Sequence, residues 1–282
     1  MNIKYLLKFL FITLFLLLSL SIYNDNTSAS TKTLKYNEGD ALALNYHRVR
    51  AYDIYDDFLL KFSNSKEMQN YSITDKDFEK QIKWLKQHKA HFLTLNEFIE
   101  YKNKGHFPKR SVWINFDDMD STIYDNAYPI LKKYKVPATG FVITGEVGQK
   151  NFHNLNIINL KELKEMKKSG LWSFASHTNK LHTLKKNGST FISTSNGHKR
   201  SDLTRSTQYL NKYFQEENNS IAYPYGKIDN QSIKLLKTTK IKYGFTLEDR
   251  AVSPSDENYK IPRILISNDA FQTLVKTWKG FK

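Results

Sequence analysis

The sequence predicts an α/β fold, a single TIM-like (β/α) barrel that is incomplete and has about seven strands. Short apolar segments alternate with amphipathic segments from residue 41 to residue 266, which is typical of parallel strands joined by helical crossovers. No glycine-rich G-x-G-x-x-G or Walker motif follows the first strand, so a doubly wound nucleotide-binding sheet is disfavoured. Polar residues follow several predicted strands, where the active sites of barrels lie.

The strands are predicted from short apolar runs, many of them rich in β-branched and aromatic residues. Polar or turn-forming residues follow most of these runs, which sets their approximate ends. The predicted strands span residues 41–46, 111–116, 138–143, 171–175, 220–223, 243–247 and 261–266.

The helices are predicted from apolar residues that recur every three to four positions and from capping residues. They span residues 74–87, 94–102, 124–134, 159–169, 202–214 and 229–239. Thr94 and Glu97 form a capping-box pattern. Pro129 is expected to kink its helix, Gly170 to end another, and Asn268 to cap the last one.

The N-terminal segment has the order of a secretory signal peptide. Two lysines precede an apolar run at residues 9–20, and small residues around Ala29 offer a cleavage site. An uncleaved anchor is the alternative, because the apolar stretch approaches the ~20 residues that span a bilayer. We expect residues 1–29 to be a signal peptide and residues 30–282 to be a secreted domain.

The composition excludes some chemistries and suggests a location. The chain has no cysteine, so any metal must be held by histidine and carboxylate, and any nucleophile is not a thiol. An exported chain without cysteine hints at a Gram-positive cell surface or cell wall. Lys and Arg total 43 against 28 Asp and Glu, which favours anionic cell-surface polymers as partners. No nucleic-acid-binding motif is present.

Two adjacent carboxylates, Asp117 and Asp118, follow the predicted strand at 111–116. Neighbouring carboxylates repel each other, and a nearby cation removes that repulsion. One of the two can then bind the cation while the other accepts a proton. The competing interpretation is a helix N-cap, a position that Asp favours.

Two histidines, His177 and His182, follow the predicted strand at 171–175. A lone histidine is usually a polar surface residue, but two histidines and an aspartate at strand ends can converge on one ion. Such a three-ligand set leaves open positions for water and substrate, as catalytic metal sites do. Zn²⁺ is the first candidate, and Co²⁺ or Ni²⁺ also suit these ligands.

Three further residues are candidates for the chemistry. Tyr225 lies in a Pro-Gly turn that can aim its backbone N–H at an oxyanion, although an ordinary β-to-α turn explains the same pattern. His47, at the end of the first strand, can protonate a leaving amine. Arg263 lies in an otherwise apolar strand and needs a carboxylate partner, for which Asp117 is a candidate.

Taken together, the motifs resemble those of the NodB-homology polysaccharide deacetylases, carbohydrate esterase family four. Residues 115–118 resemble the family's T-F-D-D motif, residues 177–182 its H-[ST]-x-x-H motif and residues 223–226 its R-x-P-Y-G motif, in the same order. The histidine spacing is five instead of four, and Ala222 stands near the usual arginine. The early position of His47 in the sequence resembles the motif order of the poly-β-1,6-N-acetyl-D-glucosamine N-deacetylase branch, whose late motifs are circularly permuted.

The resemblance implies a role for each candidate residue. The implied roles are general base for Asp117, metal ligand for Asp118, His177 and His182, oxyanion donor for Tyr225, general acid for His47, and orientation of Asp117 for Arg263.

The implied activity is metal-dependent N-deacetylation of poly-β-1,6-N-acetyl-D-glucosamine by a monomer. This reaction releases acetate and leaves a partly cationic biofilm polysaccharide. Chitin oligomers or peptidoglycan are alternative substrates, and a non-catalytic polysaccharide-binding adhesin is an alternative class. A basic surface protein that binds DNA or teichoic acid is the third alternative interpretation. A base beside the metal argues against a pure binder.

Overall fold

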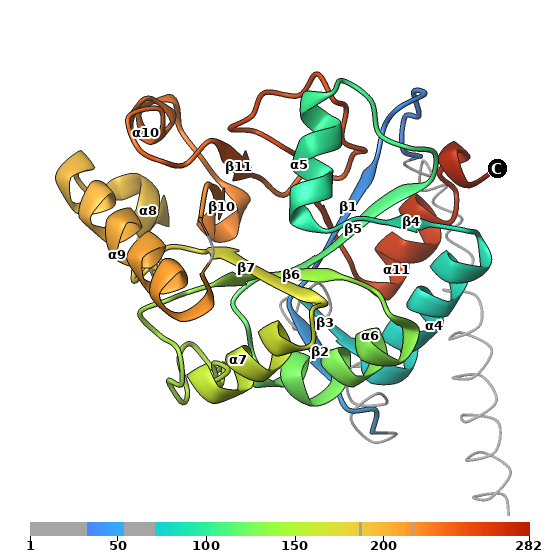
Figure 1. Ribbon diagram of the computed structural model, residues 1–282, viewed down its shortest axis with the longest axis horizontal. Helices are drawn as coiled ribbons and strands as arrows, with labels where there is room; N and C mark the ends of the chain where they lie inside the picture. Colours follow the sequence, from blue (N-terminus) through green and yellow to red (C-terminus); the bar gives the residue numbers. More distant parts are fainter. Residues whose placement is uncertain (1–32, 54–70, 186–187, 216) are drawn as a thin grey trace, which may run out of the picture. The chain divides into compact units, whose positions relative to one another are not determined.

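A curved sheet of parallel strands forms the centre of the fold in the computed structural model (Figure 1). The structure describes residues 33–53, 71–185, 188–215 and 217–282, so the expected signal peptide lies outside the described residues. Within the described part the sheet has the order β11-β10-β7-β6-β5-β1-β12, and β4 pairs with the start of β5.

Seven strands of this sheet lie within or overlap the predicted ones, whereas β4 was not predicted and β12 is shorter than the predicted strand at 261–266. The strands of the sheet are β1 (Leu42–Tyr46), β4 (His91–Phe92), β5 (Ser111–Phe116), β6 (Ala138–Val142), β7 (Trp172–Ser176), β10 (Ser220–Ala222), β11 (Tyr243–Phe245) and β12 (Ile264–Leu265). Two short ladders lie outside the sheet: β2 (Arg48–Arg50) with β3 (Ser72–Thr74), and β8 (Leu184–Lys185) with β9 (Gly188–Ser189).

The two edges of the sheet approach each other through the segment that leads into β12. Ile261 donates its N–H to Gly244 O, and Thr246 and Glu248 donate theirs to Ile261 O and Arg263 O. β12 itself pairs with β1. The sheet thus curls into a (β/α) barrel whose β11–β12 side is only thinly connected, which confirms the predicted incomplete barrel.

Side chains alternate between the two faces of the sheet, as the pleat requires. Leu42 and Leu44 pack in the core that the outer helices share, whereas Ala43, Trp113 and Phe141 belong to a separate apolar cluster. Because both faces are covered, the strands are apolar almost throughout.

The helices surround the sheet (Figure 1). None of the described helices is long and apolar enough to cross a membrane. The helical segments are α4 (Asp75–Gln87), α5 (Leu95–Asn103), η2 (Ile123–Ala127), α6 (Tyr128–Tyr134), α7 (Leu160–Lys168), α8 (Thr190–Ser193), α9 (Asn196–Phe214), η3 (Pro224–Gly226), α10 (Asn230–Leu236), α11 (Asn268–Ala270), η4 (Phe271–Val275) and η5 (Lys279–Phe281).

Local capping signals place several helix starts correctly and two incorrectly. The predicted capping box of Thr94 and Glu97 is present at α5. However, α9 begins before the predicted Asp202, because the Ser195 side chain accepts the His198 N–H and starts the helix there. Ser267, and not Asn268, caps α11.

Pro129 interrupts its helix as predicted, and the interruption takes the form of a π-helical turn. Residues Ile123–Ala127 are π-helical, and Tyr128–Tyr134 are α-helical with the proline in the first turn. A proline has no N–H to donate and its ring crowds the preceding turn, so the α-helical ladder cannot run through it.

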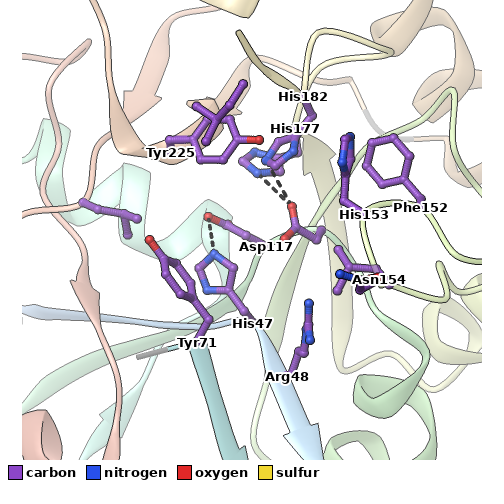
Figure 2. Close-up of a pocket in the computed structure, with 14 residues that line it drawn as sticks. His47, Arg48, Tyr71, Asp117, Phe152, His153, Asn154, His177, His182 and Tyr225 are labelled. Atoms are coloured by element: carbon purple, nitrogen blue, oxygen red, sulfur yellow. Dashed lines mark ion pairs between the residues drawn. The ribbon is translucent and has the colours of Figure 1, made fainter. Parts of the chain in front are cut away.

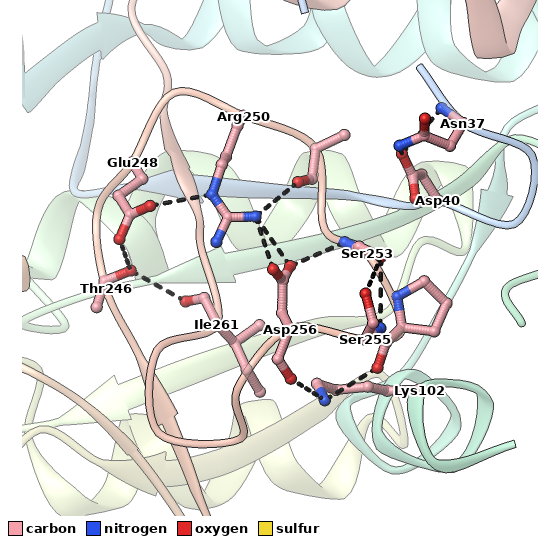
Figure 3. A network of polar contacts seen from close by, with 12 residues as sticks. Asn37, Asp40, Lys102, Thr246, Glu248, Arg250, Ser253, Ser255, Asp256 and Ile261 are labelled. Atoms are coloured by element: carbon pink, nitrogen blue, oxygen red, sulfur yellow. Dashed lines mark hydrogen bonds and ion pairs between the residues drawn. The ribbon is translucent and has the colours of Figure 1, made fainter. Parts of the chain in front are cut away.

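A polar network holds the long connection between β11 and β12 (Figure 3). Arg250 binds both carboxylate oxygens of Asp256 at 2.9 and 3.0 Å. The buried Lys102 ammonium donates to Pro254 O, Asp256 O and Asn258 Oδ1 at 3.3, 2.6 and 2.8 Å. The network therefore fixes the segment that returns the chain toward β12.

We expect Lys102→Met to destabilise the protein by about 2 kcal/mol, because acceptors bound by this buried ammonium lose their donor. Urea unfolding of the variant and the wild-type protein measures the difference. Lys104→Met is the matched control, since Lys104 lies at the same helix end and its ammonium makes exposed contacts, an ion pair with Glu100 and an approach to the Tyr101 ring. Equal stability of all three proteins would contradict this account.

Candidate metal centre

The candidate residues meet at the carboxyl-terminal edge of the parallel sheet. His47 follows β1, Asp117 and Asp118 follow β5, His177 follows β7, and Tyr225 lies in the turn after β10. Because these strands are parallel and in register, their ends lie at one edge of the sheet. Together with His182, they line one pocket of about 520 Å³ (Figure 2).

Three of the predicted residues form a compact ligand group. The Nε2 atoms of His177 and His182 lie 3.3 and 3.2 Å from Asp118 Oδ1, and all three side chains are buried. Asp118 Oδ1 is buried without a hydrogen-bond partner, which is costly unless a cation satisfies it. One carboxylate and two imidazoles around a common point fit a divalent metal ion.

The backbone after β5 turns sharply to aim Asp118 at the histidines. Asp118 and Met119 have φ values of 64° and 62°, in the left-handed region that non-glycine residues rarely adopt. The Met119 N–H donates to Asp117 O at 2.7 Å and closes the turn. Neither aspartate caps a helix, because η2 begins only after Thr122. Strain of this kind is kept where the surroundings fix the conformation, often at functional sites.

A hydrogen bond orients His177, and burial sets the protonation state of His182. His177 Nδ1 lies 2.9 Å from Ala222 O, so a proton on Nδ1 leaves the Nε2 lone pair facing the group. Burial lowers the pKa of His182 to about 4, against the attraction of Asp118. His182 is therefore neutral at pH 7 and has a free lone pair.

Asp117, next to the ligand residue Asp118, is paired with Arg263. The guanidinium binds both carboxylate oxygens at 2.6 and 2.8 Å and also donates to Asn115 Oδ1 at 2.9 Å. Arg263 is completely buried. Burial alone would raise the pKa of Asp117, but the charge and hydrogen bonds of Arg263, together with the charges of His177 and His47, hold this pKa below the usual value. Asp117 is therefore ionised at neutral pH.

His47 lies on the other side of Asp117. Its Nε2 is 3.9 Å from Asp117 Oδ2, and its ring meets the Tyr71 ring edge-on at 4.8 Å. Burial lowers the pKa of His47, while the two aspartates oppose this shift. The imidazole thus gives up a bound proton more readily than an ordinary histidine.

Part of the pocket rim was not predicted from the sequence. Phe152 and Leu155 pair across a tight turn whose central residues, His153 and Asn154, have φ values of 48° and 63°, as in a two-residue hairpin of type I′. All four line the pocket with Tyr71. An asparagine within a short polar loop was the only local signal for this turn.

The incomplete barrel carries at its rim a buried carboxylate–imidazole group that could hold a metal ion. The chain belongs to the polysaccharide deacetylase family, which it matches over residues 104–244. The family expected from the motifs is thereby confirmed.

Named relatives and solved structures support this membership. The chain is 55% identical over 263 residues to the poly-β-1,6-N-acetyl-D-glucosamine N-deacetylase of Staphylococcus epidermidis, covering 93% of this chain and 91% of the relative. It is 56% identical over 253 residues to that of Staphylococcus aureus, covering 89% and 87%. The structure of IcaB from Ammonifex degensii has a TM-score of 0.74 and 28% identity over 86% of this chain and 99% of the other. The Streptococcus pyogenes deacetylase PplD in complex with acetate has a TM-score of 0.71 and 26% identity over 86% and 100%.

Proposed function

We propose that this deacetylase removes N-acetyl groups from poly-β-1,6-N-acetyl-D-glucosamine, releasing acetate and leaving free amines on the polymer. The observation that carries the chemistry is the pairing of a buried ligand group with a second carboxylate, Asp117, that Arg263 keeps ionised. The choice of polymer is supported by the names of relatives more than half identical to this chain.

We assign the metal to Asp118, His177 and His182, with Zn²⁺ as the first candidate and Co²⁺ or Ni²⁺ as alternatives. A divalent cation bound there would polarise the acetamide carbonyl and lower the pKa of a water molecule. The orphaned Asp118 Oδ1 supports this assignment.

The remaining residues would handle the protons and the developing charge. Asp117 accepts a proton from the attacking water, whose oxygen bonds to the acetamide carbon. The Tyr225 backbone N–H donates to the carbonyl oxygen as it gains negative charge. His47 protonates the nitrogen as the C–N bond breaks, and acetate and the free amine leave.

Replacing the general acid should slow the reaction without emptying the metal site. We expect His47→Gln to lower kcat by about 10²- to 10⁴-fold, the usual contribution of a positioned acid. Metal content should stay at the wild-type level, because His47 is not in the ligand group. Steady-state acetate release and metal analysis of the same preparation test both parts. Unchanged kcat would remove His47 from the mechanism.

Arg263 should control the pH at which Asp117 works. Without the guanidinium, burial raises the pKa of Asp117, so more of the base is protonated and inactive at low pH. We expect Arg263→Met to move the acid limb of the kcat/KM profile to higher pH. Arg263→Lys keeps a charge but loses the two-point contact, so its limb should move less. Identical acid limbs in all three proteins would contradict this role.

The proposed substrate is tested by acetate release from defined polymers. Poly-β-1,6-N-acetyl-D-glucosamine, chitin oligomers and peptidoglycan are each incubated with the enzyme, with and without a chelator. The proposal expects release from the first polymer that the chelator stops. Release that survives the chelator would refute the metal mechanism, preferential release from another polymer would change the substrate, and binding without release would favour an adhesin.

We further propose that the mature chain is a monomer that acts at the exterior of a Gram-positive cell and associates with anionic wall polymers. The signal-like N-terminus supports the location, and the net charge of +15 of the full sequence supports the association with anionic polymers. N-terminal sequencing of the secreted protein tests the cleavage, and sedimentation tests the monomer. Elution from cell walls by salt tests the association with anionic polymers. Retention that high salt does not weaken would argue against charge-driven binding.

A further inference from the structure

The segment between the two histidines is held by a carboxylate from a distant helix. Residues 178–181, the ligand loop, connect His177 to His182. Asp202 on α9 accepts the N–H groups of Asn179 and Lys180, one on each carboxylate oxygen, both at 2.8 Å. Asp202 is buried, with 8% of its surface exposed. One side chain thus binds two consecutive backbone groups of the ligand loop.

The ligand loop is also held by the segment that follows β6. Thr144 and Gly145 donate their N–H groups to Thr178 O and Asn179 O at 3.1 and 2.9 Å. A Cβ atom at Gly145 would lie 2.6 Å from Asn179 O, so the two segments are in close contact. Thr178 has a φ of 73°, a strained value for a β-branched residue that the surrounding bonds must maintain.

The two histidines depend on this loop to different degrees. His177 directly follows β7, donates its N–H to Val142 O at 2.9 Å, and has its ring fixed by Ala222 O. His182 directly follows the ligand loop, so the conformation of the loop determines the position of the His182 ring. A shift of the loop would therefore displace His182 from Asp118 more than it displaces His177.

We propose that Asp202 is a positioning residue for the metal centre, which holds the ligand loop so that His182 completes the ligand group. This inference rests on the proposed assignment of Asp118, His177 and His182 as metal ligands. Partners that orient metal ligands typically change metal affinity by 10- to 100-fold when they are removed, although here the effect passes through the backbone of the loop.

The test measures Co²⁺ binding to the full-length protein without any substrate. Asp202→Asn keeps the size of the side chain but replaces one acceptor oxygen by an NH₂ group, which cannot accept a loop N–H. We expect Co²⁺ to bind about 10- to 100-fold more weakly, with a changed visible absorption of the bound ion. Leu210→Ala is the control, because Leu210 is a buried core residue of the same helix without a role in the loop.

The outcomes separate this inference from the proposed function. Weaker Co²⁺ binding in Asp202→Asn, with normal affinity in an equally destabilised Leu210→Ala, supports the positioning role. Wild-type affinity and absorption in Asp202→Asn overturn it, as does an equal loss of affinity in both variants. If the wild-type protein itself binds no Co²⁺, the metal assignment fails instead.

Discussion

Asp117→Asn should lower kcat by about 10²- to 10⁴-fold, the usual contribution of a positioned base, while the protein keeps its metal. The amide has nearly the same size as the carboxylate but cannot accept a proton from water at neutral pH. Asp117 does not belong to the ligand group, and each of its two oxygens accepts one hydrogen bond from Arg263. Acetate release and metal analysis on the same sample measure the two effects.

The substitution also leaves Arg263 facing a neutral partner. Breaking a buried ion pair in this way commonly costs 3–5 kcal/mol, so circular dichroism and thermal unfolding must show that the variant is folded at the assay temperature. Asn115→Ala is a useful comparison, because it removes another contact of Arg263 without touching the base. Loss of metal from folded Asp117→Asn would mean that the division of roles between the two aspartates is wrong.

His177→Ala should abolish both metal binding and turnover. It removes one of three ligands and leaves the Asp118 carboxylate buried with a single imidazole. If the cation supplies several kcal/mol of transition-state stabilisation, the rate should fall by about 10³-fold or more. Chelation of the wild-type enzyme should reproduce this loss, and added Zn²⁺ should restore the wild type far better than the variant.

His153→Ala is the matched control for the ligand substitution. His153 lines the same pocket but lies outside the ligand group, so its loss should leave the metal content unchanged. Full metal occupancy in His177→Ala, or equal metal loss in both variants, would refute the assignment.

Much of the fold could be predicted because its signals are local. Apolar runs identified seven of the eight strands of the sheet, and the cap of Thr94 with Glu97 and the stop at Gly170 identified helix ends, since each depends on neighbours within a few residues. The start of α9 was placed too late because the early turns carry few apolar residues, and the Ser195 cap alone was too weak a signal.

The sequence by itself determined the chemistry that is available: no thiol, two adjacent aspartates, two histidines and an arginine in an apolar strand. Only the tertiary structure decided how these groups meet. Parallel register brings the ends of β1, β5 and β7 to one edge, and the left-handed turn at Asp118 directs its oxygen to both imidazoles. The contact of Asp202 with the ligand loop has no sequence signature, because it joins groups more than twenty residues apart through backbone N–H groups that every residue except proline carries.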